Sequence, residues 1–140
     1  MRSFVVTAIV AAAFLWTGPA QTQEDINSGN HMLPFCEAFL RMNDRDSLQK
    51  EIDRANASSA GNPGYFIEIG RCAGEVMGLA NMLKALNAST PIRACVPLEA
   101  TRGQIIRVVV STLEQNPAEL HENFSILALA AMGKAWPCPK

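Results

Sequence analysis

Four cysteines constrain the fold of this chain more than any other feature. They are Cys36, Cys72, Cys95 and Cys138. An even number of cysteines in an exported chain is typical of a disulfide framework. No pair has the C-x-x-C spacing of a zinc site or of a haem attachment, and neither His31 nor His121 lies close to a cysteine. We therefore expect two disulfides, no metal ligand and no catalytic thiol.

The first 20 residues have the layout of a signal peptide. Arg2 precedes an apolar run over residues 4–16, and Gly18 and Ala20 supply small residues at the cleavage positions. The run is shorter than the roughly 20 residues that span a bilayer. A buried helix or an uncleaved anchor is the alternative interpretation. We expect cleavage after Ala20, a periplasmic location, and no membrane attachment of the mature chain.

Residues 21–140 are predicted to form a single domain. They carry 11 basic and 13 acidic residues, for a net charge of −2. A near-neutral domain of this kind lacks the basic surface that nucleic acid or anionic lipid requires. A partner, if there is one, has to be recognised by shape and local chemistry.

The apolar spacing predicts an all-α fold, a small disulfide-stapled bundle of four to five helices. Apolar residues recur every three or four positions over residues 29–42, which favours a first helix. Residues 43–61 carry dense mixed charge and read as a surface loop, with a short exposed helix over 47–56. A long helix follows over residues 63–86, with Asn62 as its cap and Pro63 in the first helical position.

Three glycines recur every four residues on that long helix. Gly70, Gly74 and Gly78 form a stripe without side chains along one side. Each glycine costs a helix about 1 kcal/mol relative to alanine. The usual benefit is close approach of another helix, so the stripe is a helix-packing prediction.

A capping box marks the next helix. The Thr101 hydroxyl can accept from the Gln104 N–H, while the Gln104 side chain reaches back. The β-branched run over residues 105–110 also fits a strand, but the cap and the lack of a partner strand favour a helix. A last helix is predicted to start at Asn116 as cap, with Pro117 in its first turn, and to end before Trp136.

The last two helices, joined by almost no linker, are expected to be antiparallel neighbours. Four cysteines allow three connectivities, and their number alone does not choose among them. The hairpin favours Cys95 with Cys138, which leaves Cys36 with Cys72.

No catalytic site emerges from the sequence, and no cofactor is expected. Glu68 and Glu75 lie roughly on one helix face, where a paired-acid site is conceivable and a solvated face is favoured. Arg102 and Arg107 read as solvated surface, although an arginine on a rigid helix is a good interface anchor. The G-x-S-x-G, H-E-x-x-H and phosphate-loop motifs are absent.

An ordered series of short motifs resembles a known family. The series is GRCAGEVMG at residues 70–78, CVP at 95–97, TRGQ at 101–104 with VVV at 108–110, NPAELH at 116–121 and AWPC at 135–138. It resembles the Rap/Tai family of type VI secretion amidase immunity proteins over roughly residues 30–138. The resemblance implies a helical, disulfide-containing periplasmic protein, often a homodimer, that binds a secreted peptidoglycan amidase, occludes its cleft and catalyses nothing.

Two further functional hypotheses remain beside the resemblance. The first is a small periplasmic chaperone or stress protein without a toxin partner, which would expose apolar surface at low pH. The second is a hydrolase that uses one of the two histidines. For a binding protein, the candidate contact surfaces are the charged residues 43–61 and the turn at 116–121, and the turn is preferred because two helices fix it.

Overall fold

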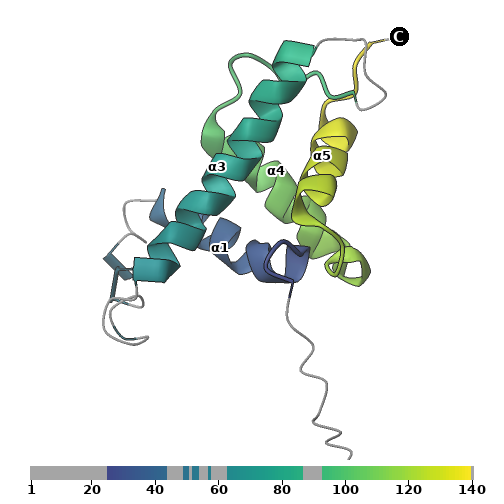
Figure 1. Cartoon of the computed structure of the whole chain (residues 1–140). Coiled ribbons are helices and arrows are strands. Elements are labelled where there is room, and N and C mark those ends of the chain that lie inside the picture. Colours follow the sequence, from purple (N-terminus) through teal and green to yellow (C-terminus); the bar gives the residue numbers. More distant parts are fainter. Residues whose placement is uncertain are drawn as a thin grey trace, which may run out of the picture.

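The computed structural model describes residues 25–43, 49–50, 52–53, 57, 63–86 and 93–139. Its main elements are α1 (Gly29–Met42), α3 (Pro63–Leu86), α4 (Arg102–Gln115), the short 3₁₀ helix η2 (Pro117–Glu119) and α5 (Phe124–Ala135). The described residues hold no β-strand, only an isolated antiparallel bridge between Ser28 and Asn123. The predicted all-α fold is confirmed (Figure 1).

Helix α1 lies across one end of the bundle. It packs against α3 and α4, while α4 packs against α5. In Figure 1, α3 and α5 extend upward from α1, with α4 between them. The core lies where the helices meet, and every α-helix contributes side chains that are fully buried. The largest of these are Met32, Val76, Ile105, Ile106, Val109, Phe124 and Met132.

Helix α4 begins where the sequence predicts. The Gln104 N–H donates to Thr101 Oγ1 at 3.3 Å, and the Thr101 N–H donates to Gln104 Oε1 at 2.8 Å. This reciprocal pair satisfies two backbone donors that the helix itself leaves without acceptors. The β-branched run is helical, and its residues at three- and four-residue spacing, such as Ile105 and Val109, are buried. The strand interpretation is therefore excluded.

Two disulfides staple the bundle. Cys36–Cys72 joins α1 to α3, with an S–S distance of 2.02 Å. Cys95–Cys138 joins the segment before α4 to the segment after α5, at 2.14 Å. The Cys95 N–H also donates to the carbonyl of Trp136 at 2.8 Å. This is the pairing expected from an antiparallel α4–α5 hairpin.

The last helix starts later than predicted. Helix α5 begins at Phe124, and its cap is Asn123, whose side chain accepts from the Ser125 N–H. Asn116 instead ends α4: its N–H donates to the Leu113 carbonyl, and its side chain makes no cap bond to η2. From Pro117 the chain forms only the single 3₁₀ turn η2, and not the predicted α-helix. The prediction was wrong because an Asn-Pro pair can open either kind of helix.

The glycine stripe does not pack within the chain. Gly70, Gly74 and Gly78 are exposed, and a Cβ placed on any of them meets no heavy atom of the described residues within 4 Å. The helix-packing prediction is therefore wrong for contacts inside the described chain. The stripe is an open face of α3.

Several predictions fall outside the described residues. These are the signal peptide, the Asn62 cap and most of the charged segment 43–61. Among the helices that the structure describes, none is both long enough and apolar enough to cross a membrane.

Candidate functional site

The connection between α4 and α5, residues 116–123, is bonded to the start of α1. Gly29 and Asn30 donate their N–H groups to the carbonyls of Glu122 and Leu120, at 3.0 and 2.7 Å. The Phe124 N–H donates to the Asn27 carbonyl at 2.7 Å. The first N–H groups of a helix have no acceptor within that helix, so the turn supplies acceptors that α1 would otherwise lack.

Gly29 allows the turn to approach this closely. A Cβ at Gly29 would lie 2.7 Å from Leu127 Cδ1 and 3.0 Å from the Leu120 carbonyl oxygen. Any larger residue would push the turn away from α1. The turn is thus fixed by α4, α5 and α1 together, one more helix than the sequence suggests.

The outer surface of the turn presents polar and acidic groups. His121 is 71% exposed, and its Nε2 lies 3.2 Å from Glu122 Oε1. Its Nδ1 lies 2.9 Å from the Ala118 carbonyl oxygen. A hollow of about 530 Å³ beside it is lined by Asp25, Ser28, Asn30 and His121. With Asp25, Glu119 and Glu122 exposed nearby, the surface is acidic and suits a partner with complementary positive potential.

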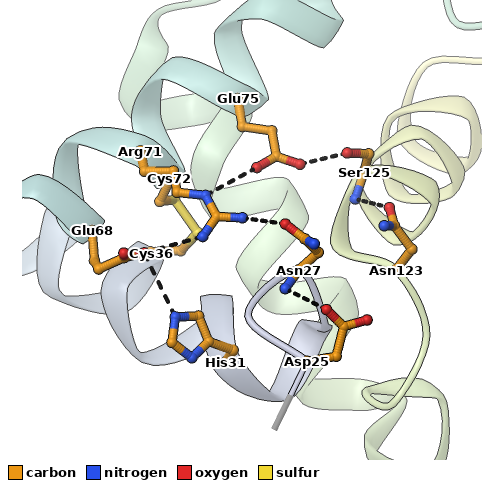
Figure 2. Close-up of polar contacts among 10 residues, drawn as sticks. All are labelled: Asp25, Asn27, His31, Cys36, Glu68, Arg71, Cys72, Glu75, Asn123 and Ser125. Atoms are coloured by element: carbon orange, nitrogen blue, oxygen red, sulfur yellow. Dashed lines mark hydrogen bonds and ion pairs between the residues drawn. A yellow bond between two sulfur atoms is a disulfide. The ribbon is translucent and has the colours of Figure 1, made fainter. Parts of the chain in front are cut away.

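A second polar cluster lies where side chains of α3 meet the start of α1 and the start of α5 (Figure 2). We call it the Arg71 cluster; its members are Asn27, His31, Glu68, Arg71, Glu75 and Ser125. The Arg71 guanidinium donates to Asn27 Oδ1 at 2.6 Å and to Glu68 Oε2 at 3.4 Å. Its Nε lies 4.0 Å from Glu75 Oε2. The Ser125 hydroxyl donates to Glu75.

The contacts of this cluster link helices and stabilise the fold. Glu68 and Glu75 are half-buried on opposite sides of Arg71 and pair with it, so the face that carries them is only partly solvated. His31 lies on the Glu68 side, with Nε2 3.6 Å from Oε2, and Ser125 lies on the Glu75 side. The histidine and the hydroxyl therefore do not meet as a base and a nucleophile. Arg71 instead neutralises both carboxylates and ties three parts of the fold together.

The other candidate residues do not form a reactive constellation in the described part of the chain. His121 contacts the carboxylate of Glu122 and a backbone carbonyl. No three His, Cys, Asp or Glu side chains among the described residues are grouped to hold a metal ion. The cysteines are paired in disulfides.

A family model, that of the Rap1a immunity proteins, matches residues 28–138. The chain belongs to the Rap1a immunity protein family. The match begins at Ser28, which caps α1, and ends at Cys138, which closes the second disulfide. No curated protein and no solved structure matches the chain.

Rap1a membership indicates a class of function for the chain. An immunity protein acts by binding a partner effector, and proteins of this family are generally not enzymes. The resemblance seen in the sequence motifs is thus confirmed at the level of the family. The turn lies within the matched residues, and so does the Arg71 cluster except for Asn27.

Sequence reasoning singled out some of these residues and missed others. It named the turn, both histidines and both glutamates, but gave no role to Asn27, Asn123 or Ser125. The spacing of Arg71 at three and four residues from Glu68 and Glu75 is a signal for helical ion pairs. No sequence pattern links Asn27 to Arg71, because 44 residues separate them.

Proposed function

We propose that this protein is exported to the periplasm and blocks a type VI secreted peptidoglycan amidase by covering its catalytic cleft. The observation that carries the proposal is the Rap1a family match over residues 28–138. The signal-like N-terminus and the two disulfides favour an oxidising compartment. Occlusion needs no reactive group, only a surface that fits the rim of the cleft.

The turn at 116–123 is the surface we propose for this contact. Its backbone is held by bonds to α1, so little conformational entropy is lost when a partner binds it. Its exposed side chains stand beside a hollow that a protruding side chain of the partner can enter. Its acidic groups add attraction for a cleft rim that carries lysine or arginine.

We also propose that two copies of the chain associate through the open face of α3. This face carries the exposed glycine stripe and the exposed side chains of Phe66, Ile67 and Met82. The stripe leaves room for a second helix to approach, with these apolar side chains beside it. Two helices crossing at the glycines would bring their backbones close together.

The dimer is tested by light scattering on the chain from Gln21 to Lys140. We expect the mass of two chains for the wild type and of one chain for Gly74→Leu, whose fold should be intact because nothing packs on Gly74 within the described chain. A wild-type chain that stays monomeric at about 100 µM, well above a micromolar Kd, contradicts the dimer.

The inhibition is tested by titration. A candidate amidase, sought among the genes beside this one, is incubated with increasing amounts of the chain, and hydrolysis of peptidoglycan is followed. We expect activity to fall linearly to zero at a fixed stoichiometry, with both proteins recovered intact. His31→Ala together with His121→Ala should still inhibit at the same stoichiometry, because neither histidine is catalytic, while the loss of His121 from the contact surface weakens the complex. If each copy of the chain inactivates several copies of the amidase, the chain acts as an enzyme and occlusion is contradicted. If the chain exposes apolar surface at low pH, the chaperone hypothesis is favoured.

A further inference from the structure

A groove of about 690 Å³ lies along α4, from Gln104 to Thr112. One wall is α4 itself, through Arg107 and Val108; the other is formed by Pro97, Ala100 and Trp136. None of these residues belongs to the turn at 116–123 or to the Arg71 cluster. The groove is therefore a separate feature, large enough for a short run of peptide side chains.

Trp136 is the largest apolar group in the groove, and its backbone is fixed. Its carbonyl accepts from Cys95 at 2.8 Å, and its N–H donates to Met132 at 2.9 Å. The Cys95–Cys138 disulfide closes the chain two residues further on. A half-buried indole held in this way gives a pre-formed apolar contact, and tryptophan and arginine are the side chains most enriched at binding hot spots.

The polar groups on the α4 wall are mostly donors with no acceptor of their own. Arg107 is exposed and forms no hydrogen bond or ion pair within the described part of the chain. The Gln104 carbonyl is used by the capping box, which leaves its NH₂ group. The Ser111 oxygen accepts from Gln115, which leaves its hydroxyl free to donate. Such a wall suits a ligand that brings a carboxylate.

Glu99 also lines the groove, from the segment that precedes α4. It makes no ion pair with Arg107 within the described residues. A ligand carboxylate must therefore approach Arg107 and stay away from Glu99, which sets the orientation of the ligand. The two charges and the indole together define a ligand with an acidic side chain next to an apolar one.

We propose that this groove docks an extended peptide segment of a partner protein, with an aspartate or glutamate on Arg107 and an adjacent apolar side chain on Trp136. The proposal goes beyond the occlusion of an amidase cleft by the turn, because it adds a second binding surface. It does not require the partner to be an amidase.

The experiment uses the chain from Gln21 to Lys140, in which Trp136 is the only tryptophan because Trp16 is removed. The probes are three blocked hexapeptides with aspartate, asparagine or lysine between two leucines. Tryptophan fluorescence and amide chemical shifts are followed up to about millimolar peptide. We expect saturable changes at Trp136 with the aspartate peptide and about fivefold weaker binding of the asparagine peptide.

Matched variants separate charge recognition from simple apolar contact. Arg107→Gln should remove the preference for the aspartate peptide, and Glu99→Gln should increase the affinity for that peptide. Arg102→Gln, which changes an arginine outside the groove, should change neither the preference nor the affinity. Equal binding of the aspartate and lysine peptides, or no saturable change at Trp136, would overturn the proposal. Because the assay contains no amidase, such a result leaves the inhibition test untouched.

Discussion

Arg71 and Asn27 are joined by a hydrogen bond of 2.6 Å between Nη2 and Oδ1, although 44 residues separate them in sequence. Asn27 lies just before α1, and its backbone carbonyl accepts from Phe124 at the start of α5. The Arg71 side chain on α3 therefore holds Asn27, the residue that connects the start of α1 to the start of α5. The position of the turn at 116–123 depends on this contact, because α1 is bonded to the turn.

Replacement of Arg71 should weaken the whole bundle. Arg71→Gln leaves the half-buried carboxylates of Glu68 and Glu75 without their cation. We expect the free energy of unfolding to fall by about 1–3 kcal/mol. Urea unfolding followed by circular dichroism measures this fall. Arg102→Gln, a change at an exposed arginine, is the control and should stay within about 0.5 kcal/mol of the wild type.

The same substitution at two glycines should have opposite effects. Gly29→Ala places a Cβ 2.7 Å from Leu127 and 3.0 Å from a backbone oxygen, and should cost about 1–3 kcal/mol. Gly74→Ala meets no described atom and should stabilise α3 by about 0.5–1 kcal/mol. Urea midpoints are compared in dilute solution, where association is weakest. A destabilised Gly74→Ala monomer would show that something covers the stripe.

The helices were predictable because their signals are local. Apolar spacing located α1 and α3, and Thr101 with Gln104 located the start of α4. The turn was not predictable, because Asn116-Pro117 has the same local pattern whether an α-helix or a single 3₁₀ turn follows. The choice is made by α1, whose N–H groups bond to the carbonyls of Leu120 and Glu122. Such long-range bonds leave no periodic trace in the sequence.

The Arg71 cluster shows the same limit. Glu68, Arg71 and Glu75 lie three and four residues apart on one helix, so their ion pairs follow from helical geometry. Asn27 and Ser125 come from distant segments and are short polar residues of a kind found on any surface. The glycine stripe does lie on one side of α3, but its spacing does not indicate whether a helix packs against it.

The two disulfides should differ in their resistance to reduction. Cys36 and Cys72 are fully buried, whereas Cys95 is exposed. Thiol exchange requires access to the sulfur, so a limiting amount of reductant should open Cys95–Cys138 first. Alkylation and peptide mapping should find labelled Cys95 and Cys138 before labelled Cys36. In the chain-entropy model the loss of either bridge costs about 4 kcal/mol. Earlier labelling of Cys36 would mean that α1 and α3 separate readily.

The two candidate surfaces for the effector can be told apart by charge reversal. Glu119 lies on the turn and Asp53 in the charged segment, and both are exposed, so neither change should disturb the core. If the turn covers the cleft, Glu119→Lys places a like charge against the basic rim that we propose for the effector. Because an interface residue acts mostly through the dissociation rate, the complex should dissociate about tenfold faster, as roughly 1.4 kcal/mol implies.

Asp53→Lys makes the same change of charge away from the turn and should leave dissociation unchanged within about twofold. Surface plasmon resonance with the immobilised amidase measures both rates, and urea unfolding checks that both variants are as stable as the wild type. The reverse result, with Asp53→Lys fast and Glu119→Lys unchanged, would move the contact to the charged segment. The bonds between the turn and α1 would then serve the fold alone, since a surface that touches no partner gains nothing from being held rigid.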